Sequence, residues 1–329
     1  MSAATLPVEP AWCLAVRPDA QRWLVSDLWA EQAVGIVGGE PKCCKSFLAL
    51  DLAVAVASGR PCLRRFAVPN PGRVLLYAAE DALHVVRQRL DGICAAAGCR
   101  LADLDVQVIT APTLRLDLPA DRAALERTVA GLQPRLLILD PFVRLHRIDE
   151  NASGEVAPLL AYLRELQRRY AASVLLVHHA RKSAGAMRAG QALRGSSEFH
   201  AWGDSNLYLR RSNDALSLTI EHRAAPSPPG IQLELRADGG ALALRPVQPS
   251  SDPLPPPAGL DERITAALLA AADTMSIQDL RAQCRVRNAT LYERLAALTA
   301  TGRLQRTANG YRLADPNGSA NRPCAHVPA

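Results

Sequence analysis

Short apolar runs alternate with longer helical patterns over the first two thirds of the chain. Five runs are bounded by turn residues, at positions 33–39, 73–80, 106–111, 135–140 and 173–179. Patterns with helical spacing separate most of them, as at 45–59 and 156–171. Apolar strands that alternate with helices predict an α/β fold with a mainly parallel sheet covered on both faces. Ligands bind at the carboxyl ends of such strands, so the polar residues that end each run are the first candidates for chemistry.

The pattern changes at a proline-dense stretch, residues 246–259, which contains almost no core-forming residues. This composition predicts a stiff, solvated linker. The remaining boundaries follow from it: an N-terminal extension at 1–22, the α/β domain at 23–245, a small domain at 260–313 and a disordered tail at 314–329.

The small domain shows helical spacing at residues 261–271, 276–284 and 288–302, followed by a predicted hairpin at 303–313 with Asn309-Gly310 as its turn. This order resembles a winged-helix domain. Arg285 and Arg287 lie near the start of its second helix-turn-helix element, where base edges are met, and are predicted to contact DNA. The alternative is that the small domain binds a protein or packs against its own chain.

Composition limits the classes of protein to consider. The 329 residues are 49% hydrophobic, enough for a sizeable core, and the net charge of +6 is compatible with a nucleic-acid partner without requiring one. The eight cysteines form no CxxC pair, which argues against a zinc site or a disulfide framework. No stretch is apolar for long enough to span a membrane, so we expect a cytoplasmic protein without a membrane partner.

The first apolar run ends in "GGEPKCCKSF", Gly38 to Phe47. The phosphate-binding pattern G-x-x-x-x-G-K-[ST] fits from Gly39 to Ser46, except that Cys44 replaces its last glycine. In this chemistry backbone N–H groups cradle phosphates, Lys45 neutralises the β and γ oxygens, and Ser46 ligates Mg²⁺. The predicted cofactor-binding residues of this loop are Gly39, Glu40, Pro41, Lys42, Cys43, Cys44, Lys45, Ser46 and Phe47. The alternative is a turn that contains a lysine by chance.

Three further strand ends carry candidate groups. Asp140 ends an apolar run and can hold Mg²⁺ through water. Glu80, followed by Asp81, can deprotonate an attacking water, or both can stabilise the first turn of the next helix. His178 and His179 end the last run and can sense a γ-phosphate, or can be ordinary strand-end residues.

Together these pieces resemble the RecA-like P-loop ATPases, in the branch of the RepA-type plasmid helicases and DnaB-type replicative helicases, which are also grouped as AAA-type ATPases. The resemblance covers residues 23–244 and rests on "GGEPKCCKSFLALDLA", "LLYAAED", "LLILDPF" and "LLVHHARKS". It implies ATP and Mg²⁺ as cofactors, with Lys45, Glu80 and Asp140 in catalysis. Cys44 is its clear departure from the pattern and puts nucleotide affinity in doubt.

The resemblance also implies a ring. Arg223 matches the arginine that reaches the nucleotide of a neighbouring subunit, with Arg210 and Arg211 as alternatives. Such an arginine requires a homo-oligomer, which in this family is a hexamer. The alternative is an ordinary surface arginine.

The segment after the histidines, residues 180–197, is rich in Gly and Ala and carries no acid. In RecA-like proteins a loop here contacts single-stranded DNA, and positive charges on flexible backbone track phosphates. Its predicted DNA-binding residues are Arg181, Lys182, Arg188 and Arg194. The alternative is a mobile, solvated loop.

Two functions from different classes follow. The first is an ATP-hydrolysing DNA motor in the replication of a plasmid or mobile element. The second is a nucleotide-gated DNA-binding regulator with weak or absent hydrolysis, which Cys44 favours. The retained Lys45, Ser46, Glu80 and Asp140 favour the motor. A metabolic kinase would explain neither the basic loop nor the small domain.

Overall fold

The chain divides into two compact units, residues 1–247 and 248–329, which are described separately below. The computed structural model describes residues 6–16, 18, 22–179, 198–212, 215–238, 241–247, 259–271, 274–284, 286 and 288–314. The predicted DNA contacts Arg181, Lys182, Arg188, Arg194, Arg285 and Arg287 lie outside these residues, as do almost all of the predicted linker and tail.

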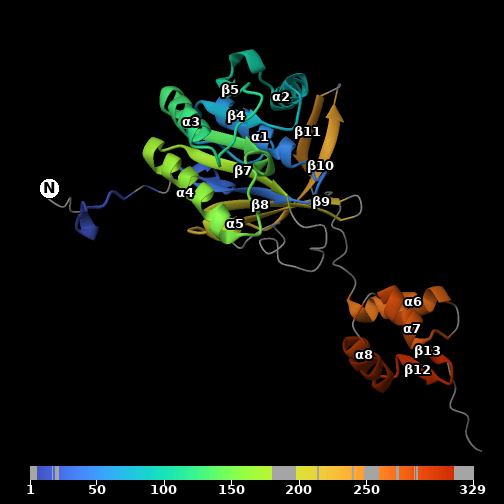
Figure 1. Cartoon of the computed structure of the whole chain (residues 1–329). Coiled ribbons are helices and arrows are strands. Elements are labelled where there is room, and N and C mark those ends of the chain that lie inside the picture. Colours follow the sequence, from blue (N-terminus) through green and yellow to red (C-terminus); the bar gives the residue numbers. More distant parts are fainter. Residues whose placement is uncertain are drawn as a thin grey trace, which may run out of the picture. The chain divides into compact units, whose positions relative to one another are not determined.

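A nine-stranded sheet with the strand order β11-β10-β9-β8-β3-β7-β6-β4-β5 forms the first unit (Figure 1). Its strands are β3 (Val34–Gly39), β4 (Val74–Ala78), β5 (Val106–Val108), β6 (Leu136–Asp140), β7 (Ser173–His179), β8 (Ser205–Ser212), β9 (Ala215–His222), β10 (Ile231–Asp238) and β11 (Ala241–Pro246). Strands β8, β3, β7, β6, β4 and β5 are parallel, and β9, β10 and β11 extend the sheet in antiparallel fashion. The predicted α/β fold with a mainly parallel sheet is confirmed.

Helices cover both faces of this sheet, because its central strands are apolar on both sides (Figure 1). One face carries α1 (Lys45–Ser58) and α2 (Leu83–Ala97); the other carries α3 (Pro119–Leu132), α4 (Ser153–Tyr170) and α5 (Glu198–Trp202). The pair β1 (Trp23–Val25) and β2 (Trp29–Ala30) and the 3-10 turns Ala11–Cys13, Leu101–Asp103 and Phe142–Arg144 complete the unit. Two hydrophobic cores therefore hold the central strands between helical layers.

Two glycines allow β8 to lie directly beside β3. A Cβ on Gly35 would fall 1.7 Å from the carbonyl oxygen of Ser205, and one on Gly39 would fall 2.4 Å from that of Leu209. Since no side chain fits at these distances, glycine is needed for this close approach. The consequence is that the end of β8 lies next to the loop that follows β3.

The second unit contains α6 (Leu260–Ala271), α7 (Ile277–Cys284), α8 (Asn288–Ala300) and a hairpin of β12 (Leu304–Thr307) with β13 (Gly310–Leu313). Its elements lie where the sequence predicts them, but the predicted turn is wrong by one residue. Thr307 pairs with Gly310, so the hairpin loop is residues 308–309. Gly310 is needed because a Cβ there would lie 2.0 Å from the carbonyl oxygen of Met275, which forms a bridge with Tyr311.

The first unit extends slightly past its predicted boundary. Strand β11 includes Pro246, and the N–H of Val247 donates to the carbonyl of Gln232. The backbone pairing of the hairpin therefore reaches two residues beyond position 245. Within the described residues, no helix is long and apolar enough to cross a membrane.

Candidate functional site

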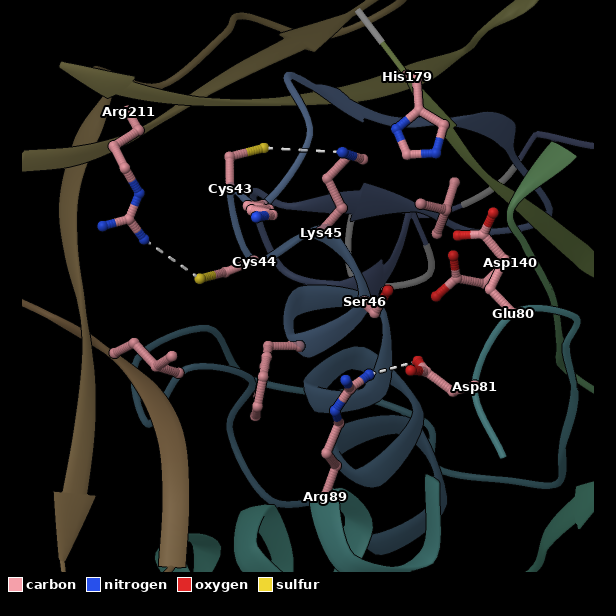
Figure 2. A pocket seen from close by; sticks show the side chains of 14 residues that line it. Cys43, Cys44, Lys45, Ser46, Glu80, Asp81, Arg89, Asp140, His179 and Arg211 are labelled. Atoms are coloured by element: carbon pink, nitrogen blue, oxygen red, sulfur yellow. Dashed lines mark hydrogen bonds and ion pairs between the residues drawn. The ribbon is translucent and has the colours of Figure 1, made fainter. Parts of the chain in front are cut away.

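The carboxyl ends of β3, β4, β6, β7 and β8 meet at one edge of the sheet, because these strands are parallel. A cavity of about 400 Å³ opens at this edge (Figure 2). Its lining residues are Lys42, Cys43, Cys44, Lys45, Ser46, Phe47, Glu80, Asp81, Arg89, Asp140, Val177, His179, Arg211 and Leu235. A cavity of this size is within the range of small-molecule sites.

The loop between β3 and α1 leads from a strand end into the start of a helix, a position where backbone N–H groups can bind anions. Strand β3 ends at Gly39 and α1 begins at Lys45, so the free N–H groups of the helix start lie at the cavity. Lys42 and Cys44 both have φ of 64°, in the left-handed region. Cys44 therefore holds the conformation for which glycine would be favoured, at a cost of about 1–3 kcal/mol. Pro41 belongs to this loop but has no N–H to donate.

Lys45 is the buried cation of the site, only 5% exposed. Its Nζ donates to the carbonyl oxygen of Glu40 at 2.7 Å and lies 3.9 Å from the Sγ of Cys43. Burial lowers the pKa of Lys45, while the nearby Cys43 and Asp140 act to raise it. The side chain is thus held at the loop by uncharged partners that an anionic ligand could replace.

Asp140 and Ser46 form the oxygen-rich part of the cavity. The Ser46 side chain is hydrogen-bonded to the Asp140 carboxylate, which comes from the end of β6. Burial raises the pKa of Asp140 to about 6, and the neighbouring Asp81 contributes in the same direction while Ser46 opposes it. A buried carboxylate with a hydroxyl beside it is a donor set for a hard divalent cation.

Glu80 lies on the same side of the cavity as Asp140 (Figure 2). Its Oε1 accepts from the Nε of Arg144 at 2.8 Å, and the Glu80 side chain is 42% exposed. The alternative role in capping the next helix is wrong, because α2 begins at Leu83 after Ala82 and has no acidic residue in its first turn.

The structure separates the two histidines. His179 lines the cavity, whereas His178 points to the other face of the sheet. The His178 ring is 1% exposed and stacks on Phe199 with 4.2 Å between ring centroids. Successive side chains of β7 point to opposite faces of the sheet, so only one of the two histidines faces the loop. The prediction that His178 binds the cofactor is therefore wrong.

Arg223 and Arg211 lie at opposite ends of the parallel strands. Arg223 follows β9, beside Asp204, so it is at the amino ends of β3 and β8. Its guanidinium pairs with Asp204 at 3.3 Å and donates to the carbonyl of Ala201. Arg211, in contrast, lines the cavity of its own chain and donates to the Sγ of Cys44 at 3.6 Å (Figure 2).

Four lining residues were not predicted as site residues: Asp81, which pairs with Arg89, then Arg89 itself, Val177 and Leu235. Arg89 lies in α2, and its guanidinium carbon is 5.2 Å from the centre of the Phe47 ring. Leu235 comes from β10, far along the chain. Nothing in the local sequence marks Arg89 or Leu235, since both depend on which elements pack beside the loop.

Comparisons with known proteins agree with this fold. A family model described as an AAA domain (AAA_25) matches residues 2–185. Among solved structures, an ATPase domain is similar with a TM-score of 0.52 and 13% identity over 65% of this chain and 86% of that domain. A DnaB-like replicative helicase, described with its interactions with primase, gives a TM-score of 0.50 and 14% identity over 65% of this chain and 57% of that one. At these identities the likeness is one of fold, and the fold is RecA-like.

Proposed function

Because the chain belongs to the AAA_25 family of AAA domains, we propose that it is an ATP-hydrolysing, DNA-binding ring motor of the RepA-helicase type. It would act in the replication of a plasmid or mobile element. One observation carries the proposal: Lys45, Ser46, Glu80 and Asp140 converge on a single cavity at the carboxyl edge of the sheet (Figure 2). These residues come from three separate segments of the chain, so a chance lysine in a turn does not account for their meeting.

Binding of the triphosphate rests on the loop and on Lys45. The N–H groups at the start of α1 and the Lys45 ammonium face the cavity, where they would hold the β- and γ-phosphates. Ser46 and Asp140 fit Mg²⁺, since a hydroxyl hydrogen-bonded to a carboxylate offers the oxygen donors that this ion prefers. When bound, the ion would offset negative charge on the phosphate oxygens.

Glu80 is the proposed general base. A water oxygen attacks the γ-phosphorus and forms the new P–O bond while the bond to the β-phosphate oxygen breaks. The water proton goes to the Glu80 carboxylate, and ADP leaves with the electrons of the broken bond. The ion pair with Arg144 would hold Glu80 at the cavity before nucleotide binds. His179 would contact the γ-phosphate from β7.

Replacement of Cys44 by glycine is expected to tighten ATP binding by about tenfold to a hundredfold. When no nucleotide is bound the loop can relax from φ 64°, and returning a Cβ to this conformation on binding costs about 1–3 kcal/mol that glycine would remove. Titration with a fluorescent ATP analogue measures the effect. Cys44→Ala is the matched control, since it removes the sulfur and keeps the Cβ, and should not tighten binding. If alanine tightens binding as much as glycine does, the sulfur rather than the backbone is the cause.

Arg223 is proposed to act on the nucleotide of the next subunit in a ring, a hexamer in the helicases that this chain resembles. Arg223→Ala should then bind nucleotide normally and lose hydrolysis. Mixing it with Lys45→Ala subunits should restore part of the activity, because intact half-sites meet at some interfaces. Phosphate release from the mixture checks this.

Arg164→Ala is the control for the Arg223 variant, because Arg164 also pairs with Asp204. If both variants lose activity equally, the Asp204 contacts are structural and Arg223 has no separate role. Light scattering that finds only monomers with ATP and Mg²⁺ present would also count against the ring.

DNA binding is proposed for residues 180–197 and for the second unit. The order α6, α7, α8 and hairpin, with a bridge from Met275 to Tyr311, supports a winged-helix assignment. Tyr292 on α8 is 51% exposed, and Arg281 and Arg306 are also at the surface. Together with Arg285 and Arg287 these side chains would contact DNA.

A nucleotide-gated DNA-binding regulator is the second candidate, favoured by the strained Cys44. ATP hydrolysis measured with and without single-stranded DNA separates the two. A motor should hydrolyse ATP faster, by severalfold or more, when DNA is present. ATP binding without turnover under either condition would favour the regulator.

A further inference from the structure

The cavity has two chemically different sides. Figure 2 shows Glu80, Asp140 and His179 on one side of Lys45, and Cys44 with Arg211 on the other. The first side has the groups suited to a γ-phosphate and its metal. A nucleotide bound with its γ-phosphate there must direct its base away from these carboxylates, so the groups on the opposite side are the ones to meet the base.

Leu235 supplies apolar surface to this cavity. It lies on the same face of β10 as Ile231 and Leu233, which are 8% and 3% exposed, yet it is itself 36% exposed. The strand therefore continues its apolar face past the point where protein atoms cover it. A ligand with an apolar face would bury this surface.

Phe47 and Arg89 supply flat surfaces to the same cavity. Phe47 lies in the first turn of α1, directly after the phosphate-binding loop, and the Arg89 guanidinium is 5.2 Å from its ring centre. Arg89 is fixed in turn by Asp81, with 2.5 Å between Nη1 and Oδ2. The ion pair fixes the position of a planar cation beside an aromatic ring, and both shapes suit stacking on a nucleobase.

We infer that Phe47, Arg89 and Leu235 form the nucleobase subsite, and that it holds a base by its faces rather than by its edges. This inference rests on the proposed ATP site. Phe47 and Leu235 have no polar side-chain atoms, and the Asp81 carboxylate is already paired with Arg89. A base edge finds no carboxylate, amide or hydroxyl among these three side chains, and the guanidinium N–H groups of Arg89 and Arg211 can donate to a ring nitrogen or carbonyl acceptor of any base. The subsite should therefore bind purine and pyrimidine nucleoside triphosphates with affinities within about tenfold of one another. A site that hydrogen-bonds one particular base edge would instead reject the other bases by roughly 10⁴-fold.

The test compares ATP, GTP, CTP and inorganic tripolyphosphate as ligands of the full-length protein, by calorimetric titration with Mg²⁺. Leu235→Ala should weaken ATP by about tenfold and leave tripolyphosphate unchanged, because only the nucleotide has a base. Leu235→Phe should tighten ATP by severalfold through stacking. Leu242→Ala is the matched control: Leu242 lies on the same face of the β10–β11 hairpin, is 37% exposed and does not line the cavity.

The results distinguish failure of the nucleobase subsite from failure of the proposed ATP site. If ATP binds no more tightly than tripolyphosphate, the triphosphate site stands and the base subsite is wrong. The base subsite is also wrong if Leu235→Ala weakens the binding of ATP and tripolyphosphate equally, or weakens neither. It is wrong too if GTP and CTP bind a thousandfold more weakly than ATP. If the parent binds neither ATP nor tripolyphosphate, the proposed function fails together with the subsite.

Discussion

Glu80→Gln should abolish steady-state ATP hydrolysis, with a loss of about 10²- to 10⁴-fold, while ATP binding stays nearly intact. The amide has the shape of the carboxylate but cannot take the proton of the attacking water. Binding should survive because the Glu80 side chain is 42% exposed and pairs with the still more exposed Arg144, so its replacement disturbs no core contact. Phosphate release measures the turnover, and titration of an ATP analogue measures the affinity.

Asp81→Asn is the matched control for this variant, since Asp81 is the adjacent carboxylate and is paired with Arg89. It should retain most of the turnover at saturating ATP, with weaker ATP binding because Arg89 loses the ion pair that fixes its position. Unchanged turnover in Glu80→Gln would contradict the catalytic role, and Glu80 would then be only a surface partner of Arg144. Equal losses in the two variants would assign the effect to the local charge rather than to Glu80.

Lys45→Ala should lose ATP binding, by about a hundredfold or more. Removal of a buried cation from the site takes away the charge that faces the phosphates, and contacts of this kind are worth about 2–5 kcal/mol. The control is Lys42→Ala, in the same loop but exposed, which should bind ATP with little change. Fluorescent ATP titration gives both affinities, and thermal unfolding shows that the variants are folded. Equal affinity in Lys45→Ala and the parent would mean that the loop binds no phosphate.

Local patterns were sufficient for much of this fold. Five apolar runs became β3, β4, β5, β6 and β7, and polar residues that follow or end β3, β4, β6 and β7 met at one edge. This inference works because the carboxyl ends of parallel strands all lie at the same edge of the sheet. Residues that end different strands in the sequence are therefore close together in the fold. Glu80 and Asp140 could be assigned to the site on that basis alone.

Side-chain direction and long-range pairing could not be obtained in the same way. Strand β7 is apolar on both faces, so its sequence did not show whether His178 or His179 turns toward the loop. Arg211 reaches the cavity because β8 pairs in parallel with β3, and Leu235 reaches it because the antiparallel strands β9 and β10 follow β8. The register of these strands is set by pairing with residues distant in the sequence. The hairpin glycine at 310 resembled a turn residue, but a close contact with Met275 explains it.

We propose that the cavity beside Lys45 hydrolyses ATP. Phosphate release from ATP and Mg²⁺ by the purified full-length chain, measured beside Lys45→Ala prepared identically, tests it most directly. We predict steady release by the parent and none above background by the variant. Equal rates in the two proteins, or no release by a parent shown to be folded, would mean that this cavity does not hydrolyse ATP.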